Sequence, residues 1–265
     1  MRDNFIYIST DLIHNMVIAR GISSADFVKG LKEIPDNIVL LNDDRKHANG
    51  LNAHTKFSTI QGARSVKAYL LDNKIGDKKV IDYQSNEDLD ELLDYEIADL
   101  LYLSHMGFPM HDAFSSKLHN RYIYMMMKAH FTRGYYRDAN DFNTILNVCV
   151  KRHMLATIDK HQPVFSRANV LERIRHRSSV LIVNLPKSAV KRLVKLTENG
   201  MIIAFDQVQV TKHRHLYRVP LLIEKYPDAQ STWYYKQDIY QNAFRVGTLT
   251  YNTADQRKWR LRIKK

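Results

Sequence analysis

The stretch Lys258-Trp259-Arg260-Leu261-Arg262-Ile263-Lys264 gives the clearest indication of the fold. Apolar and basic residues alternate through it, so an extended chain places Trp259, Leu261 and Ile263 on one face and the cations on the other. This alternation is typical of a strand with one buried and one solvated face. The stretch therefore predicts a strand whose exposed side carries a row of positive charge.

Strand and helix patterns mix along the rest of the chain. Strand patterns lie at residues 5–9, 37–41, 79–83, 121–127, 132–136, 180–184, 201–210, 216–224 and 247–251. Helical patterns lie at residues 24–33, 63–71, 85–105, 140–158, 168–177, 186–198 and 233–244. Residues 121–127 and 132–136 are expected to pair as a hairpin. The mixture predicts an α+β fold, in two lobes of mixed or largely antiparallel sheets flanked by helices.

The clearest helix pattern spans residues 85–105. Ser85 or Asn86 is placed to cap its start, and the acidic residues that follow suit the positive end of a helix dipole. Leucine and isoleucine recur at helical spacing up to Leu101, and Gly107 and Pro109 follow. The pattern predicts one long helix.

Charge divides the chain into two parts. The net charge is +12, but residues 1–150 hold 17 Lys and Arg against 20 Asp and Glu, whereas residues 151–265 hold 23 against 8. Lys160-His161-Gln162-Pro163 is the best boundary near this change. The sequence thus predicts a mildly acidic, helix-rich lobe at residues 1–160 and a strongly basic, strand-rich lobe at residues 161–265.

The basic excess points to an anionic partner, because many cations on one surface attract phosphates without reading bases. The residues expected to form a polyanion-binding surface are Arg173, Arg175, Arg177, Lys187, Lys191, Arg192, Lys195, Lys258, Arg260 and Arg262. Lys187, Lys191 and Lys195 recur every fourth residue and share one helix face. Nucleic acid or an acidic protein would fit such a surface, and a solvated basic face without a partner is the alternative.

A histidine-containing turn offers an enzyme as the second hypothesis. His105, His111 and Asp112 lie in and beside a loop that contains Gly107 and Pro109. Histidine transfers protons near neutral pH, so these side chains are candidates for a hydrolase or a phosphate-transferring enzyme. Their spacing matches no metal signature, and structural loop residues are the alternative.

Three smaller clusters have local explanations that we favour. Arg133 and Arg137 flank a Tyr-Tyr pair, which suits phosphate or base contact but also an ordinary hairpin strand. Asp36 and Asp44 with Lys46 resemble the acidic-lysine layout of metal-dependent nucleases, at a separation that is short for it. His213 and His215 point the same way on an extended chain, most simply as a basic hairpin tip.

Absent motifs exclude several enzyme classes. The chain has no Gly-x-Gly-x-x-Gly, no Walker loop, no Gly-x-Ser-x-Gly and no His-Glu-x-x-His, so neither cofactor nor metal is expected. Cys149, the single cysteine, lies in an apolar run and is expected to be buried. A lone thiol favours a reducing compartment, and no signal-peptide pattern or membrane-length apolar run is present. We expect a cytoplasmic protein without an integral membrane segment.

Three functions stay open at this point. The first is a non-enzymatic binding protein whose basic C-terminal lobe contacts nucleic acid or another polyanion. The second is the enzyme that uses His105, His111 and Asp112. The third is a scaffold or assembly subunit, in which the acidic 85–105 segment docks against a basic lobe.

Overall fold

The computed structural model describes residues 4–42, 44–105, 113–126, 131–161, 182–211, 215–225, 236–254 and 258–264. Seven α-helices and thirteen strands lie within these ranges, and the strands form antiparallel pairs. The predicted mixed α+β class is therefore confirmed. No helix in the described ranges is both long and apolar enough to cross a membrane.

The chain divides into two compact units. Residues Ile8–Ile145 form one, and Met1–Tyr7 together with Leu146–Lys265 form the other. We call them the N-terminal unit and the C-terminal unit. The 160/161 domain boundary stays a prediction.

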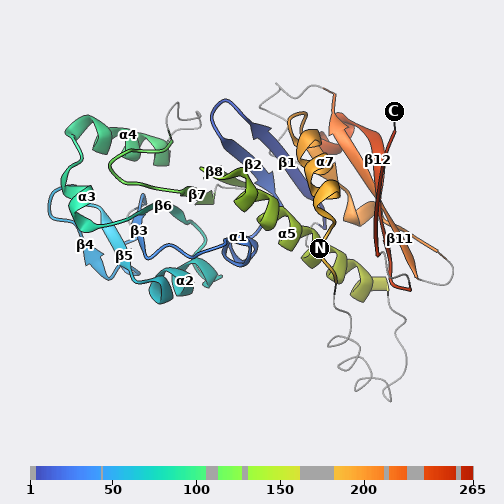
Figure 1. Cartoon of the computed structure of the whole chain (residues 1–265), viewed down its shortest axis with the longest axis horizontal. Helices are drawn as coiled ribbons and strands as arrows, with labels where there is room; N and C mark the ends of the chain where they lie inside the picture. The colour runs from blue at the N-terminus through green and yellow to red at the C-terminus, as the bar shows by residue number, and fades with distance from the viewer. Residues whose placement is uncertain are drawn as a thin grey trace, which may run out of the picture. The chain divides into compact units, whose positions relative to one another are not determined.

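The N-terminal unit holds an antiparallel sheet in the order β2-β8-β7-β6-β3-β5-β4 (Figure 1). Its strands are β2 (Met16–Arg20), β3 (Asn37–Leu40), β4 (Gly50–Leu51), β5 (Ser58–Gln61), β6 (Lys79–Tyr83), β7 (Tyr122–Met126) and β8 (Phe131–Tyr136). Its helices are α1 (Ser24–Gly30), α2 (Ala63–Leu71), α3 (Asn86–Asp90) and α4 (Asp94–His105). The predicted hairpin is confirmed, since β7 pairs with β8 from Tyr122 opposite Tyr136 to Met126 opposite Thr132.

The C-terminal unit holds a sheet in the order β13-β12-β11-β9, with β10 paired to β11. Its strands are β9 (Met201–Ile203), β10 (Gln209–Val210), β11 (Leu216–Glu224), β12 (Ala243–Asn252) and β13 (Trp259–Ile263). Two helices belong to it entirely, α7 (Lys187–Thr197) and α8 (Lys236–Gln241). The elements β1 (Ile6–Asp11) and α5 (Ala139–His161) each contribute residues to both units.

Alternation gives the C-terminal sheet one buried and one solvated face. Tyr217, Val219, Leu249, Tyr251 and Trp259 lie on the inner face and are all buried. Helix α7 lies on this side of the strands (Figure 1), and the Trp259 indole Nε1 donates to the Val183 carbonyl, just before α7, at 2.8 Å. The inner face is thus part of the core, and the outer face is left to polar side chains.

The single helix predicted for residues 85–105 is wrong, because the segment forms α3 and α4 with a break at residues 91–93. Ser85 caps α3 as expected, and its hydroxyl accepts from the Asp88 N–H. At the break, Lys117 donates to the Glu91 carbonyl at 3.0 Å and pairs with Glu96 at 2.6 Å, while Glu96 accepts from the Leu93 N–H. These contacts satisfy backbone groups at the end of α3 and the start of α4 that lack partners within a helix. Because Lys117 is more than twenty residues away in sequence, helical periodicity cannot predict the break.

Three other boundaries differ from expectation. The predicted helix at 233–244 ends at Gln241, where α8 (Lys236–Gln241) stops, and β12 begins at Ala243 rather than Gly247. Residues 233–235 lie outside the described residues. The predicted strand at 201–210 is interrupted by a 3₁₀ turn, η3 (Phe205–Gln207). Residues 182–184 of the predicted strand at 180–184 are not in a strand. The predicted helix at 168–177 lies outside the described residues.

Candidate nucleic-acid interface

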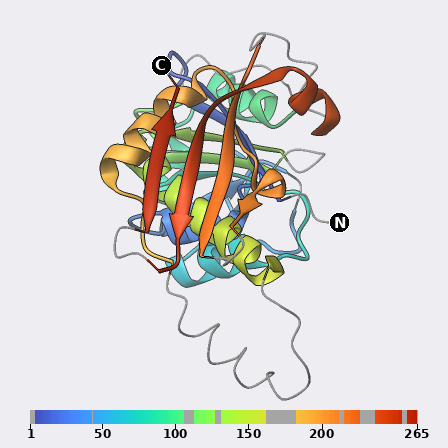
Figure 2. The ribbon, with the colours of Figure 1, turned by 90° about the vertical axis from the view of Figure 1, so that its right-hand side faces the viewer.

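Strand β13 presents its cations to the solvated side of the C-terminal sheet. Arg260 and Arg262 are exposed and Lys258 is partly exposed, whereas the intervening Trp259 is only 5% exposed. The alternation predicted from the sequence therefore places these three cations on one face. Figure 2 looks onto that outer face, with β11, β12 and β13 nearest the viewer.

Strand register brings a further arginine into line with this row. Arg260 lies opposite Thr250 on β12, and Thr250 lies opposite Arg218 on β11. Adjacent strands are about 4.8 Å apart, so the Cα atoms of Arg260 and Arg218 are roughly 10 Å apart with a threonine between them. Arg218 thus forms the second side of a positively charged surface.

A register shift adds a fifth cation. The pairing of β11 with β12 changes between Leu221 and Leu222, where Arg245 lies opposite Leu222. The Arg245 guanidinium then donates to the Thr248 hydroxyl at 2.8 Å and to the Gly247 carbonyl at 3.3 Å. These bonds direct its charge toward Thr248, which lines the same face.

The five cations surround a hollow of about 550 Å³. Hydroxyl and amide groups line it, and its ten described lining residues include five Lys or Arg, with no acidic and no aromatic residue among them. We call Arg218, Arg245, Lys258, Arg260 and Arg262 the basic face. The lining residues are Gln209, Leu216, Arg218, Arg245, Thr248, Thr250, Asn252, Lys258, Arg260 and Arg262.

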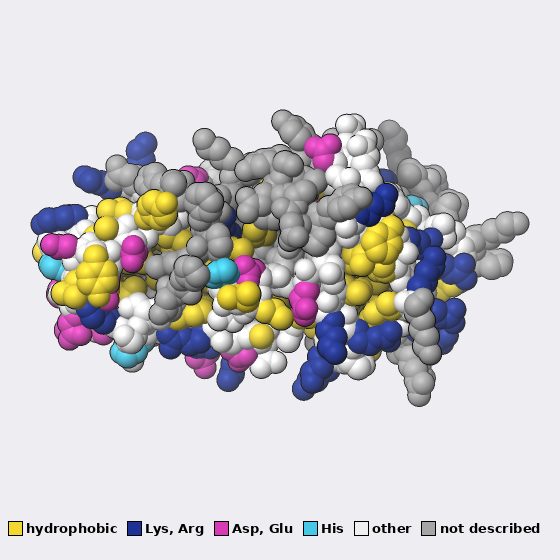
Figure 3. Space-filling model, turned by 90° about the horizontal axis from the view of Figure 1, so that it is seen from above, with side chains coloured by type: hydrophobic (Ala, Val, Ile, Leu, Met, Phe, Trp, Pro, Cys, Tyr) yellow, Lys and Arg dark blue, Asp and Glu magenta, His cyan; other side chains and the backbone are white. Residues whose placement is uncertain are grey.

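This arrangement is suited to bind anions. Arginine presents a planar fork of donors that fits phosphate oxygens, and threonine hydroxyls add neutral donors between the forks. No carboxylate of a described residue lines the hollow, so its described side chains give it a positive potential. Figure 3 shows Lys and Arg side chains gathered over this group of strands, at the right of the view.

Two residues of the basic face, Arg218 and Arg245, were not predicted from the sequence. Arg218 had a usable signal, because it alternates with Tyr217 and Val219 in a segment correctly predicted as a strand. Arg245 had none, because the register shift that places it depends on the pairing of two strands.

The other predicted cations do not all join this surface. Lys187, Lys191, Arg192 and Lys195 are exposed on α7, whose buried residues include Val190 and Leu193. Since α7 lies on the inner side of the sheet, its lysines and the basic face lie on opposite sides of the strands (Figure 1). Arg173, Arg175 and Arg177 lie outside the described residues.

Most of the histidine-containing turn proposed as an enzyme site lies outside the described residues. His105 ends α4, and its side chain, His111 and Asp112 lie outside the described residues. Cys149 is fully buried, as expected.

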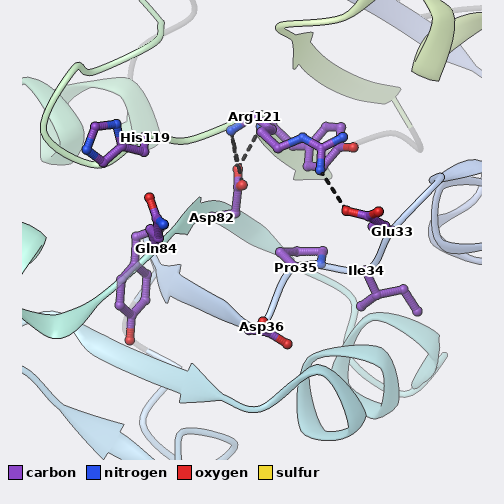
Figure 4. Close-up of a pocket in the computed structure, with 10 residues that line it drawn as sticks. Glu33, Ile34, Pro35, Asp36, Asp82, Gln84, His119 and Arg121 are labelled. Atoms are coloured by element: carbon purple, nitrogen blue, oxygen red, sulfur yellow. Dashed lines mark hydrogen bonds and ion pairs between the residues drawn. The ribbon is translucent and has the colours of Figure 1, made fainter.

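A second hollow, of about 350 Å³, lies in the N-terminal unit around Asp82 (Figure 4). The Asp82 carboxylate is only 7% exposed and accepts from the backbone N–H groups of Arg121, at 3.0 Å, and Tyr122, at 2.6 Å. Figure 4 shows the Arg121 side chain reaching to Glu33, at 3.4 Å, with His119 on the other side of Asp82. Burial raises the pKa of Asp82 to about 6, although the backbone hydrogen bonds oppose the shift.

Such a carboxyl is able to exchange a proton near neutral pH. Its oxygens, however, are held by the N–H groups that begin β7, so its evident task is to anchor that strand. Among the residues that the structure describes, no group of three or more His, Cys, Asp or Glu is placed to hold a metal.

The smaller clusters have local partners. Arg133 is 5% exposed within β8, and the Arg137 guanidinium lies 5.4 Å from the centre of the Phe114 ring. Asp44 pairs with His47 and accepts from Tyr69, while Asp36 lines the hollow around Asp82. The His215 ring lies 3.3 Å from the Thr253 hydroxyl, and His213 is outside the described residues.

No family model, no curated protein and no solved structure matches the chain.

Proposed function

We propose that the protein binds nucleic acid through the basic face of the C-terminal unit. The observation that carries the proposal is the hollow in which five Lys and Arg converge. None of its described lining residues is acidic. A solvated strand face needs polar side chains, but balanced charges would meet that need equally well. Concentrated charge of one sign suits a partner that is itself densely and regularly charged, as a phosphodiester backbone is.

The salt dependence of binding tests this proposal. Each phosphate neutralised on duplex DNA contributes about −0.9 to the slope of log K against log salt, so five contacts predict a slope near −4.5. Affinity for a fluorescent duplex should therefore fall about 500-fold between roughly 50 and 200 mM salt. Fluorescence anisotropy with the full chain measures both the affinity and the slope.

A matched pair of variants locates the surface. Arg260→Gln with Arg262→Gln removes two charges from the basic face and keeps long polar side chains, so the slope should fall by about two. The loss of affinity over the same salt range should shrink to about 40-fold. The control is Lys191→Gln with Lys195→Gln, which removes the same charge from α7 on the other side of the sheet, and should leave the slope unchanged.

Two outcomes would overturn the proposal. Absence of binding to both RNA and DNA at the lowest salt would remove nucleic acid as the partner. Equal losses in the two double variants would show that net charge, rather than the basic face, accounts for the binding.

A further inference from the structure

Resting on the proposed function, we infer that the basic face selects double-helical over single-stranded nucleic acid. It holds the two phosphate backbones and stacks no bases. The feature behind this inference is the separation of ring systems from cations across the C-terminal sheet.

Three aromatic residues of β11, β12 and β13 alternate with residues that line the hollow, and all three are buried on the other face of the sheet. Phe244, near the start of β12, is 47% exposed but does not line the hollow. Tyr217, Tyr251 and Trp259 are 2%, 1% and 5% exposed, and each alternates with a residue that lines the hollow. Tyr251 and Trp259 pack against each other, with ring centres 4.6 Å apart. These three rings are buried in the core, so none of them has an exposed face on which a base could stack.

Single-stranded nucleic acid gains much of its affinity from such rings. Proteins that bind it without sequence preference stack successive bases on aromatic side chains along a basic groove. A single strand on the basic face would have phosphate contacts alone, and its bases would stay unsupported. A duplex keeps its bases stacked internally and requires nothing of the protein but charge.

The arrangement of cations also suits two backbones. Arg260 on β13 and Arg218 on β11 are separated by the Thr250 position, which places their Cα atoms roughly 10 Å apart. The grooves of B-form DNA are about 6 and 12 Å wide, so long side chains at this spacing reach phosphates on both sides of one groove. A duplex also carries one charge per ~1.7 Å of axis, twice the density of either strand alone.

The test compares one sequence as a labelled single strand and as its annealed duplex, using the full chain near 100 mM salt. We expect the duplex to bind about tenfold or more tightly. The slopes should also differ, near −4.5 for the duplex and near −3.5 for the single strand, because fewer counterions are released per contact. Changing the base sequence should leave both affinities unaltered.

A gain-of-function variant provides an independent readout. Thr250→Tyr adds a ring to the floor of the hollow, on a strand that tolerates aromatic residues. It should raise the affinity for the single strand relative to that for the duplex several-fold, since only unstacked bases can use the ring. The control is Lys195→Tyr, which adds a ring on the exposed face of α7, away from the basic face.

The outcomes separate the two proposals. If neither form binds, nucleic-acid binding itself is refuted. If the single strand binds as tightly as the duplex or more tightly, the basic face still binds nucleic acid but the inferred selection is wrong. An unchanged ratio of the two affinities in Thr250→Tyr would likewise contradict the inference that the lack of a stacking ring disfavours the single strand.

Discussion

At the scale of single residues, buried polar groups in this protein are tied to backbone ends. The Lys78 ammonium is buried and donates to the Leu70 and Asp72 carbonyls at 2.9 and 2.7 Å, at the C-terminal end of α2. Burial lowers the pKa of Lys78, and the charge nevertheless suits the negative end of a helix dipole. Asp82 plays the opposite role at the start of β7, where its carboxylate accepts hydrogen bonds from the backbone N–H groups of Arg121 and Tyr122.

Asp82 predicts a specific pH dependence of stability. Its pKa of about 6 in the folded chain lies above the unfolded value near 4, so the folded state retains a proton that the unfolded state loses between these values. The stabilisation from this proton is complete below pH ~4 and is lost as the pH rises through ~6, by roughly 3 kcal/mol in all. The Asp82→Asn variant should not lose this stability, because an amide does not titrate in this pH range.

Urea unfolding of both proteins at pH 4, 5.5 and 7 measures the effect. The stability of Asp82→Asn relative to the natural chain should rise across this series by roughly 2 kcal/mol, since part of the loss has already occurred at pH 4. Parallel pH curves would show that the carboxyl titrates as it does in the unfolded chain.

At the scale of elements, the junction after α7 depends on a glycine. Gly200 has φ +63° and its N–H donates to the Thr197 carbonyl, which closes the last turn of the helix. A Cβ at this position would collide with the Glu224 carboxylate at the end of β11. Gly200 therefore permits both the left-handed turn and the close approach of the strand.

A series of three alanine substitutions separates these two causes. Gly200→Ala meets both the φ strain and the collision, and should lower the free energy of unfolding by about 2–3 kcal/mol. Gly62→Ala meets only the φ strain, at φ +89° with open space around it, and should cost about 1–2 kcal/mol. Gly76→Ala meets neither and should be neutral.

Thermal unfolding followed by circular dichroism ranks the three variants. A Gly200→Ala variant as stable as Gly76→Ala would mean that neither the turn nor the approach of Glu224 constrains this junction.

At the scale of the whole molecule, the C-terminal unit is assembled from both ends of the chain. Asn4 donates to the Thr157 hydroxyl at 2.9 Å and lies 2.7 Å from the His153 ring nitrogen, on α5. His153 stacks on Phe205 with ring centres 5.4 Å apart, and the Tyr7 hydroxyl donates to Glu224. The unit's core thus requires residues that precede position 160.

This assembly makes a prediction about fragments. A chain of residues 161–265 lacks the buried α5 side chains Val150, Met154 and Ile158, so it should show no cooperative thermal transition. A chain of residues 146–265 restores them and should regain most of the transition, less the contribution of residues 1–7. A sharp transition in the shorter fragment would instead support the boundary predicted at residue 160.

Several elements could be predicted from local sequence because their causes are local. The strand ending at Ile263 follows from period-two alternation, and the strand at residues 216–224 from a mostly apolar run that alternates only at its start. Helix α7 follows from its apolar face, with Pro186 before it and Gly200 after it. Lys258, Arg260 and Arg262 share a face because of the period-two alternation. Alternation depends only on backbone geometry, which the sequence carries in full.

The rest of the candidate site depended on partners distant in sequence. Arg218 joins Arg260 through the intervening β12, and a register shift brings Arg245 to the same hollow. The break between α3 and α4 depends on Lys117, and the placement of α7 on the inner side of the sheet separates its lysines from the basic face. The sequence by itself determined the fold class and which strands carry charge on one face. Only the tertiary structure decided which charges meet, because strand pairing and helix packing are set by contacts between segments whose positions no local period encodes.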